Sequence, residues 1–329
     1  MIRVASHNVM QGRLLAALTA KYERLGASAW SNSGGSESNR LSNLSVEAVA
    51  AAAAGTPHLL CLQETPRFGV AARLAASLSA DHLVAAVQAP DGRAEHDTHQ
   101  KRLDGQLSIV YCSRTLELVG APRLVELRAL PSLSRLEYAY SRTGRPDPKY
   151  GLHGVFRLRP RRGSPAAAAA AAAPPVAPDR LVHAYSFHLD AAGPLIHKRR
   201  QARSLSAAMA RHRRAALVVA AGDTNAFSLR RRDAPRVLDF IIRPLLDRHG
   251  LADVVADFCD GDPYDEATHY FARQREPEAI KRLGVALGWL GLDLPRRTDV
   301  ILANAPAEAA GRLTTRASDH DIVYAHFCV

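Results

Sequence analysis

Residues 217–226 read LVVAAGDTNA, a short apolar run that ends in small polar residues. The run predicts a buried β-strand over Leu217–Ala221, because it is brief and contains adjacent valines. Asp223 and Asn225 follow this strand almost at once. A carboxylate and an amide in such a place form either an ordinary Asx turn or part of a ligand site, since α/β proteins bind ligands at the ends of their strands. The rest of the sequence is needed to choose between these alternatives.

Similar apolar runs recur along the chain and alternate with segments of helical character. This alternation predicts a layered α/β protein. The predicted helices are Leu44–Ala54, Gly69–Ser79, Ile196–His212 and Pro235–Asp247. The other predicted strands are Ile2–Val9, His58–Gln63, Gln106–Cys112, Gly151–Leu158, Leu181–His188, Thr298–Ala303 and Asp321–Phe327.

Polar side chains stand at the ends of several of these strands, where they can converge in one crevice. Carboxylate and amide oxygens suit Mg²⁺ or Mn²⁺, and an Asp–His pair suits proton transfer or charge stabilisation. The sequence contains no cysteine cluster, P-loop or GxSxG elbow that would compete for the catalytic role. The polar residues are Asn8, Glu64, His188, Asp223, Asn225, Asp299, Asp319 and His320.

In their order along the chain, these motifs resemble those of the endonuclease/exonuclease/phosphatase superfamily. The resemblance extends over residues 1–329 and includes a basic segment at 197–205, HKRRQARSL. The motifs are Asn8 in SHNVMQG, Glu64 in CLQET, His188 in SFHLD, Asp223 and Asn225 in AAGDTNAF, Asp299 in RTDVIL, and Asp319 and His320 in ASDHDIVYA.

The resemblance implies a four-layered α/β sandwich, in which two mixed sheets face each other between outer helices. It also implies roles for the matched residues. Glu64 would bind the catalytic Mg²⁺, for which Mn²⁺ can substitute, with Asn8 and Asp319 completing the metal shell. Asp223 would orient or deprotonate the attacking water, and Asn225 and His188 would contact the substrate phosphate. His320, steadied by Asp299 or Asp319, would stabilise the charge that develops on phosphorus.

The overall charge bears on the substrate. Lysine and arginine outnumber the acids by 43 to 32, which gives a net charge of +11. This excess favours polyanionic partners such as DNA or RNA, although arginine-rich chains are also typical of GC-rich genomes. Four widely spaced cysteines indicate reduced thiols without a disulfide framework. No signal peptide or membrane-spanning run is recognisable, so we expect a soluble intracellular protein without membrane insertion.

The sequence therefore predicts one endonuclease/exonuclease/phosphatase domain over residues 1–329, with loop insertions at about 26–43 and 160–180. The hypothesis for its function is a Mg²⁺-dependent phosphodiesterase, a nuclease or an enzyme that processes DNA or RNA ends. A first alternative is a phosphatase or phosphodiesterase for a small molecule or lipid phosphate. A second is a catalytically idle binding subunit of a ribonucleoprotein complex.

Overall fold

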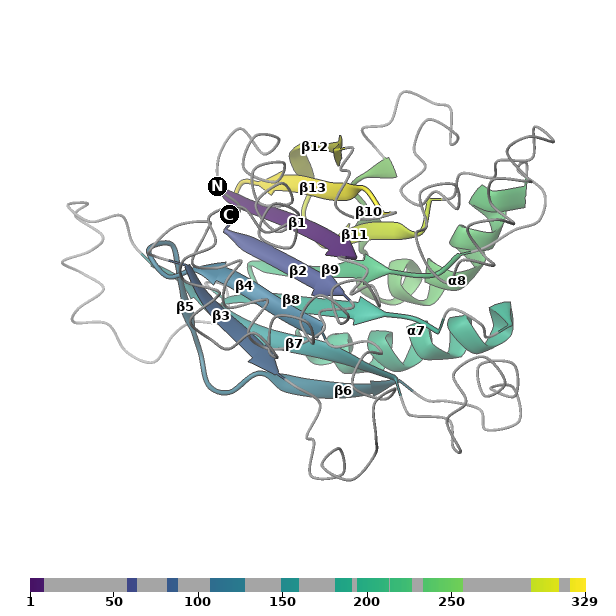
Figure 1. Ribbon diagram of the computed structural model, residues 1–329, viewed down its shortest axis with the longest axis horizontal. Helices are drawn as coiled ribbons and strands as arrows, with labels where there is room; N and C mark the ends of the chain where they lie inside the picture. The colour runs from purple at the N-terminus through teal and green to yellow at the C-terminus, as the bar shows by residue number, and fades with distance from the viewer. Residues whose placement is uncertain are drawn as a thin grey trace, which may run out of the picture.

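The structure is a computed structural model and describes residues 1–8, 58–63, 82–87, 107–127, 149–159, 181–190, 194–212, 214–226, 233–256, 297–313 and 320–329 (Figure 1). Two predicted helices, Leu44–Ala54 and Gly69–Ser79, lie outside these residues, as do the expected insertions at 26–43 and 160–180.

The described residues form two mixed sheets. In the first sheet the strands run in the order β12-β13-β1-β2-β4-β3, and only the β1–β2 pair is parallel among those described. The bounds of its strands are β1 Ile2–Asn8, β2 Leu59–Gln63, β3 His82–Val87, β4 Leu107–Cys112, β12 Ala307–Leu313 and β13 Ile322–Phe327.

The second sheet has the order β10-β11-β9-β8-β7-β5, with β6 paired beside β7. Its β8–β9 pair is parallel, and the other described pairs are antiparallel. Its strands are β5 Leu116–Leu118, β6 Arg123–Leu127, β7 Lys149–Leu158, β8 Leu181–His188, β9 Leu217–Asp223, β10 Ala252–Asp253 and β11 Asp299–Ala303.

The core between the two sheets follows from the alternation of side chains along each strand. Val4, Leu59, Val182 and Val219 all point into this core and are almost completely buried. Cys61 packs there as a small apolar residue, and burial raises the pKa of its thiol to about 12. The packed inner faces confirm the predicted sandwich of two sheets.

Helix α7 (Leu195–Met209), the 3₁₀ turn η2 (Ala210–His212) and helix α8 (Ala234–His249) cover the other face of the second sheet (Figure 1). Pro244 lies inside α8 and has no N–H to donate to the carbonyl of Phe240. Arg199 of α7 supplies that donor, with Nη1 2.6 Å from the Phe240 oxygen. This contact gives Arg199 a structural role in joining the two helices.

A buried polar bridge joins the sheets near the end of β2. Gln63 Nε2 donates to Ser186 Oγ over 3.2 Å, and Ser6 Oγ donates to Gln63 Oε1 over 3.3 Å. Ser186 Oγ in turn donates to the Leu62 carbonyl at 3.2 Å. Because these groups are shielded from water, each depends on its protein partners.

Replacing Ser186 with alanine is expected to lower the free energy of unfolding by about 1–3 kcal/mol, because the Gln63 amide loses a buried acceptor. Urea denaturation measures the change. Ser204→Ala on α7 is the matched control, since the exposed Ser204 hydroxyl donates to the Arg200 carbonyl along the helix surface. Equal midpoints for the two variants would contradict the bridge.

Candidate functional site

The candidate site lies at one end of the space between the sheets. Along β9, Leu217, Val219 and Ala221 point into the inter-sheet core, so alternation carries Asp223 to the same side. The same alternation brings Asn8 inward from β1 and Asp299 inward from β11. The site is therefore a polar continuation of the apolar core, formed where the strands of both sheets begin or end.

Asp223 is the centre of the arrangement and is 1% exposed. Its Oδ2 accepts a hydrogen bond from Asn8 Nδ2 at 3.0 Å, which joins the two sheets. His188 Nε2 lies 3.6 Å from the same oxygen and His320 Nε2 lies 3.8 Å from it. Both distances exceed a hydrogen bond, so the two imidazoles flank the carboxylate without binding it directly.

His320 is held in place by Asp299. Its Nδ1 lies 2.8 Å from Asp299 Oδ2, and the carboxylate is completely buried. Because a carboxylate only accepts, Nδ1 carries the proton and Nε2 faces Asp223 with its lone pair or its second proton. Thr298, which the sequence interpretation missed, donates its hydroxyl to the same Asp299 oxygen at 3.0 Å. The Asp299 carboxylate, itself held by Thr298, fixes both the tautomer and the direction of the His320 ring.

The segment from Asp223 to Asn225 is both an Asx turn and part of the candidate site, so the two alternatives drawn from the sequence are compatible. The Asn225 backbone N–H donates to Asp223 Oδ1 at 2.7 Å, which is an Asx turn, while Asp223 Oδ2 faces the site. Asn225 has a φ of 49°, a left-handed conformation that asparagine tolerates better than most residues. Its side-chain amide donates to the Leu189 carbonyl at 2.8 Å and so ties the end of β9 to the end of β8.

Lys198 of α7 lies beneath this turn and is 2% exposed. Its Nζ donates to the Asn225 carbonyl at 2.5 Å. Burial lowers the pKa of Lys198, and the nearby carboxylates of Asp223 and Asp190 act in the opposite direction. The sequence showed a basic segment here, but only the fold shows that Lys198 turns inward to the turn that follows Asp223.

The structure brings together six of the residues that the motifs singled out: Asn8, His188, Asp223, Asn225, Asp299 and His320. Glu64 and Asp319, the other two expected metal ligands, lie outside the described residues. Each adjoins a described one, since Glu64 follows Gln63 at the end of β2 and Asp319 precedes His320.

The sequence and the fold give different results in comparisons with known proteins. No protein-family model matches the sequence, and no curated protein matches it either. Solved structures do match the fold. The endonuclease/exonuclease/phosphatase from Bacteroides vulgatus has a TM-score of 0.57 at 13% identity, over 98% of this chain and 97% of that one.

The chain has the endonuclease/exonuclease/phosphatase fold. TDP2 from D. rerio, complexed with single strand DNA product, also matches, with a TM-score of 0.53 and 12% identity over 100% of this chain and 99% of that one. ANGEL2, a 2′,3′-cyclic phosphatase in complex with adenosine-2′,3′-vanadate, matches with a TM-score of 0.55 and 14% identity over 98% and 94% of the two chains.

In this endonuclease/exonuclease/phosphatase fold, Asp223, Asp299 and His320 form a group that can hold a metal ion. One ligand atom from each lies within 4.8 Å of the others. Asn8 adds an amide whose nitrogen end is turned to Asp223, so its carbonyl end is a further hard oxygen donor. A set dominated by oxygens suits Mg²⁺ or Mn²⁺ better than softer ions.

The segments described by the structure contain no helix that is both long and apolar enough to cross a membrane.

Proposed function

We propose that this protein is a metal-dependent phosphodiesterase and that its substrate is a nucleic acid. The observation that carries the proposal is the arrangement around Asp223 Oδ2, where Asn8, His188 and the Asp299-bound His320 meet between the two sheets. In this arrangement the buried carboxylate can accept a proton, and the two imidazoles can stabilise a developing negative charge.

The proposed metal ion is Mg²⁺, with Mn²⁺ as a substitute, held by Glu64, Asn8 and Asp319. The oxygen donors that the structure brings to this edge fit such an ion, since Asp223 and Asp299 lie close by. When bound, the ion supplies positive charge to the phosphate oxygens and favours ionisation of water.

The side chains of the protein carry out the remaining steps of the reaction. Asp223 orients the attacking water and accepts its proton as the new phosphorus–oxygen bond forms and the ester bond breaks. His320, whose ring is fixed through Asp299, faces the charge that develops on the phosphoryl oxygens. His188 contacts the phosphate from the β8 side, and Asn225 holds a phosphate oxygen. Asn225 and His320 are already oriented by their bonds to the Leu189 carbonyl and to Asp299, so little reorganisation is needed.

Two observations support a nucleic acid as the substrate. The chain carries a net charge of +11, which attracts polyanions. Two of the similar structures hold nucleic-acid compounds, the single strand DNA product of TDP2 and the adenosine-2′,3′-vanadate of ANGEL2. Arg199 is not counted toward a phosphate-binding track, because its guanidinium bonds the Phe240 carbonyl and stacks 4.4 Å from the Phe240 ring.

A hydrolysis panel with the purified full-length chain tests the proposal. The substrates are labelled single-stranded DNA, an RNA oligonucleotide, an RNA with a 2′,3′-cyclic phosphate end, sphingomyelin and an inositol phosphate. Each is incubated with Mg²⁺, with Mn²⁺ and with a chelator. We expect metal-dependent cleavage of a nucleic-acid substrate. Cleavage of only the lipid or inositol substrate would replace the proposal with the small-molecule alternative, and binding without turnover would favour the idle subunit.

The salt dependence of binding provides a second readout. A nucleic acid that contacts several phosphates loses affinity steeply with salt, by a factor of about 10³ or more between 50 and 200 mM when six or more contacts form. A small phosphate ester contacts the protein through one or two charges, so its affinity falls far less. A shallow slope for DNA and RNA would contradict a nucleic-acid substrate.

A further inference from the structure

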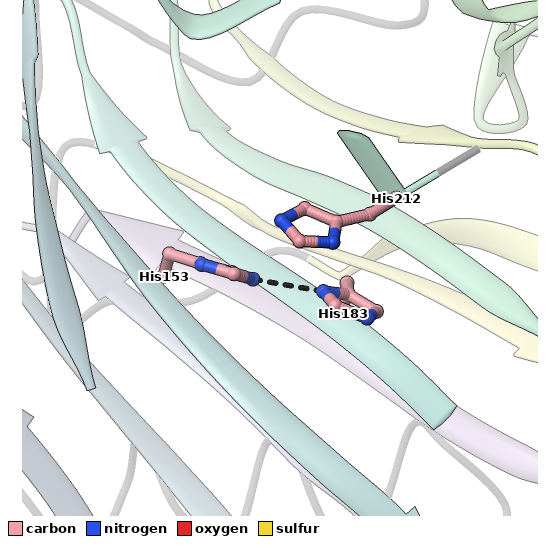
Figure 2. A group of neighbouring side chains, drawn as sticks. All are labelled: His153, His183 and His212. Carbon is pink, nitrogen blue, oxygen red and sulfur yellow. Dashed lines mark hydrogen bonds between the residues drawn. The ribbon is translucent and has the colours of Figure 1, made fainter. Parts of the chain in front are cut away.

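Three histidines gather on the helix-covered face of the second sheet, away from the candidate active site. They are His153 on β7, His183 on β8 and His212 in the turn η2 (Figure 2). His183 lies near the beginning of β8, whereas His188, which flanks Asp223, ends the same strand. The two groups also face opposite sides of the sheet, because 183 and 188 differ by an odd number of residues along an extended strand.

The three rings come within reach of a single ion. One ring nitrogen from each lies within 4.8 Å of the others. His153 Nε2 and His183 Nδ1 are 3.0 Å apart, with nearly parallel ring planes. The His212 ring lies over that of His183 (Figure 2). The two ring centroids are 4.0 Å apart. Side chains from two strands and one turn thus meet at one point.

Ring stacking holds the group together, and His153 also stacks on Tyr185 with 4.2 Å between the ring centroids, but hydrogen bonds in the described segments leave most of the ring nitrogens unaccounted for. Three rings carry six ring nitrogens, yet within the described parts of the chain only one hydrogen bond, between His153 and His183, joins them. Among those same residues, no carboxylate pairs with any of the three. Burial lowers the pKa of His153 to about 3 and of His183 to about 4, so both rings are neutral at pH 7. A neutral imidazole keeps the lone pair that a metal ion needs.

We propose that His153, His183 and His212 form a second metal site, which takes a divalent transition-metal ion of the zinc class. Two nitrogens bound at about 2.0–2.1 Å in a tetrahedral site lie roughly 3.3 Å apart, close to the 3.0 Å of the His153–His183 pair. The ion would replace their hydrogen bond, and the two rings would turn their lone pairs toward it. Three imidazoles leave a fourth position for water or an anion.

The donor set and its surroundings also select the ion. Imidazole nitrogens suit Zn²⁺, Cu²⁺ or Ni²⁺, whereas the oxygen-rich group around Asp223 suits Mg²⁺ or Mn²⁺. The positive charges of Arg123 and Arg211 act on this cluster, so a cation must be held there by strong nitrogen coordination rather than by charge attraction. The two sites would therefore hold different ions. A metal at the histidine site would fasten η2, and with it the end of α7, to β7 and β8.

The test is a titration of the metal-free chain with Zn²⁺ in the presence of excess Mg²⁺, which occupies the oxygen-rich site around Asp223. We expect one tight equivalent of Zn²⁺ and a rise in melting temperature, because an ion that binds only the folded state stabilises it. In His212→Ala, affinity should fall by at least about 100-fold, the upper end of the loss for an outer-shell partner. His212 is half-buried on a turn, so its removal leaves the core intact.

His249→Ala is the matched control, since His249 is a half-buried histidine that contacts Ser206 and lies outside the cluster. It should bind Zn²⁺ like the parent. Co²⁺ substitution adds a direct readout, because three nitrogen ligands in a four-coordinate site produce intense visible bands that His212→Ala should lose. Absence of saturable Zn²⁺ binding in the parent, or equal affinity in His212→Ala, would overturn the site.

Discussion

Replacing Asp223 with asparagine is expected to lower kcat for phosphodiester hydrolysis by about 10³-fold, within the range for loss of a general base. The amide has nearly the same shape as the carboxylate but neither accepts a proton nor carries the charge that the two flanking imidazoles face. The folded structure should persist. The Asn8 amide can turn to present its carbonyl to the new NH₂ group, so the link between the sheets is kept. Saturating Mg²⁺ offsets the weaker metal binding that follows when this carbonyl leaves the metal.

The measurement compares single-turnover rates with saturating Mg²⁺ and the urea midpoints of the same preparations. Asp239→Asn is the matched control, because Asp239 is an exposed carboxylate on α8 that pairs with Arg243. The control should retain full activity. An Asp223→Asn enzyme that hydrolyses the substrate at the parent rate would remove Asp223 from the mechanism and, with it, the proposed centre of the site.

Replacing Gly222 with alanine is expected to cost about 3 kcal/mol of the free energy of unfolding, at the upper end for overpacking in a core. A Cβ at this position would lie 2.0 Å from the Phe187 carbonyl oxygen and 2.8 Å from its carbon. Both are backbone atoms of the neighbouring strand β8, in register with Gly222, so they cannot swing away as a side chain could. The strands must separate, and Asp223 moves with β9.

Gly151→Ala provides the control in the same sheet. Its new Cβ would meet its nearest atom at 3.5 Å, which is ordinary van der Waals contact. Urea denaturation should place the control within about 1 kcal/mol of the parent, since the added methyl causes no overlap. The Gly222→Ala enzyme, where it still folds, should also lose activity through the displaced Asp223. A fully stable and active Gly222→Ala variant would show that β8 and β9 can separate without cost.

Several elements could be predicted from the local sequence because the hydrophobic pattern and the intrinsic propensities of their residues favour the same secondary structure. The valine-rich run at Leu217–Ala221 forms the buried centre of β9, and Pro235–Asp247 lies inside α8. The observed elements are slightly longer or differently ended. β9 continues to Asp223 because Gly222 and Asp223 pair with β8 on one side and β11 on the other. The end of Ile196–His212 is a 3₁₀ turn rather than α-helix.

Other strands have no local signal that separates them from loops. β12, Ala307–Leu313, consists largely of alanine, glycine and charged residues, and it forms a strand because β13 offers it a line of backbone partners. β5 and β10 are only three and two residues long. Such strands follow from tertiary pairing, so a single sequence does not predict them.

The sequence by itself determined where the main buried strands lie, the order of the motifs and the polar residues that end the strands. Together with the resemblance to the superfamily, these features predicted the sandwich fold and placed Asp223, Asp299 and His320 in one site. Short apolar runs are a local property of the chain, which is why they can be recognised without a structure.

Only the tertiary structure decided what lies next to what. Asn8 and Asp223 are 215 residues apart in the chain, yet their side chains meet because β1 and β9 end at the same edge of facing sheets. The same holds for the histidine cluster, whose members come from two strands and a turn. His153 and His183 are 30 residues apart, and only the antiparallel pairing of β7 with β8 brings their rings together. Contacts between distant segments depend on register and packing, which no local pattern encodes.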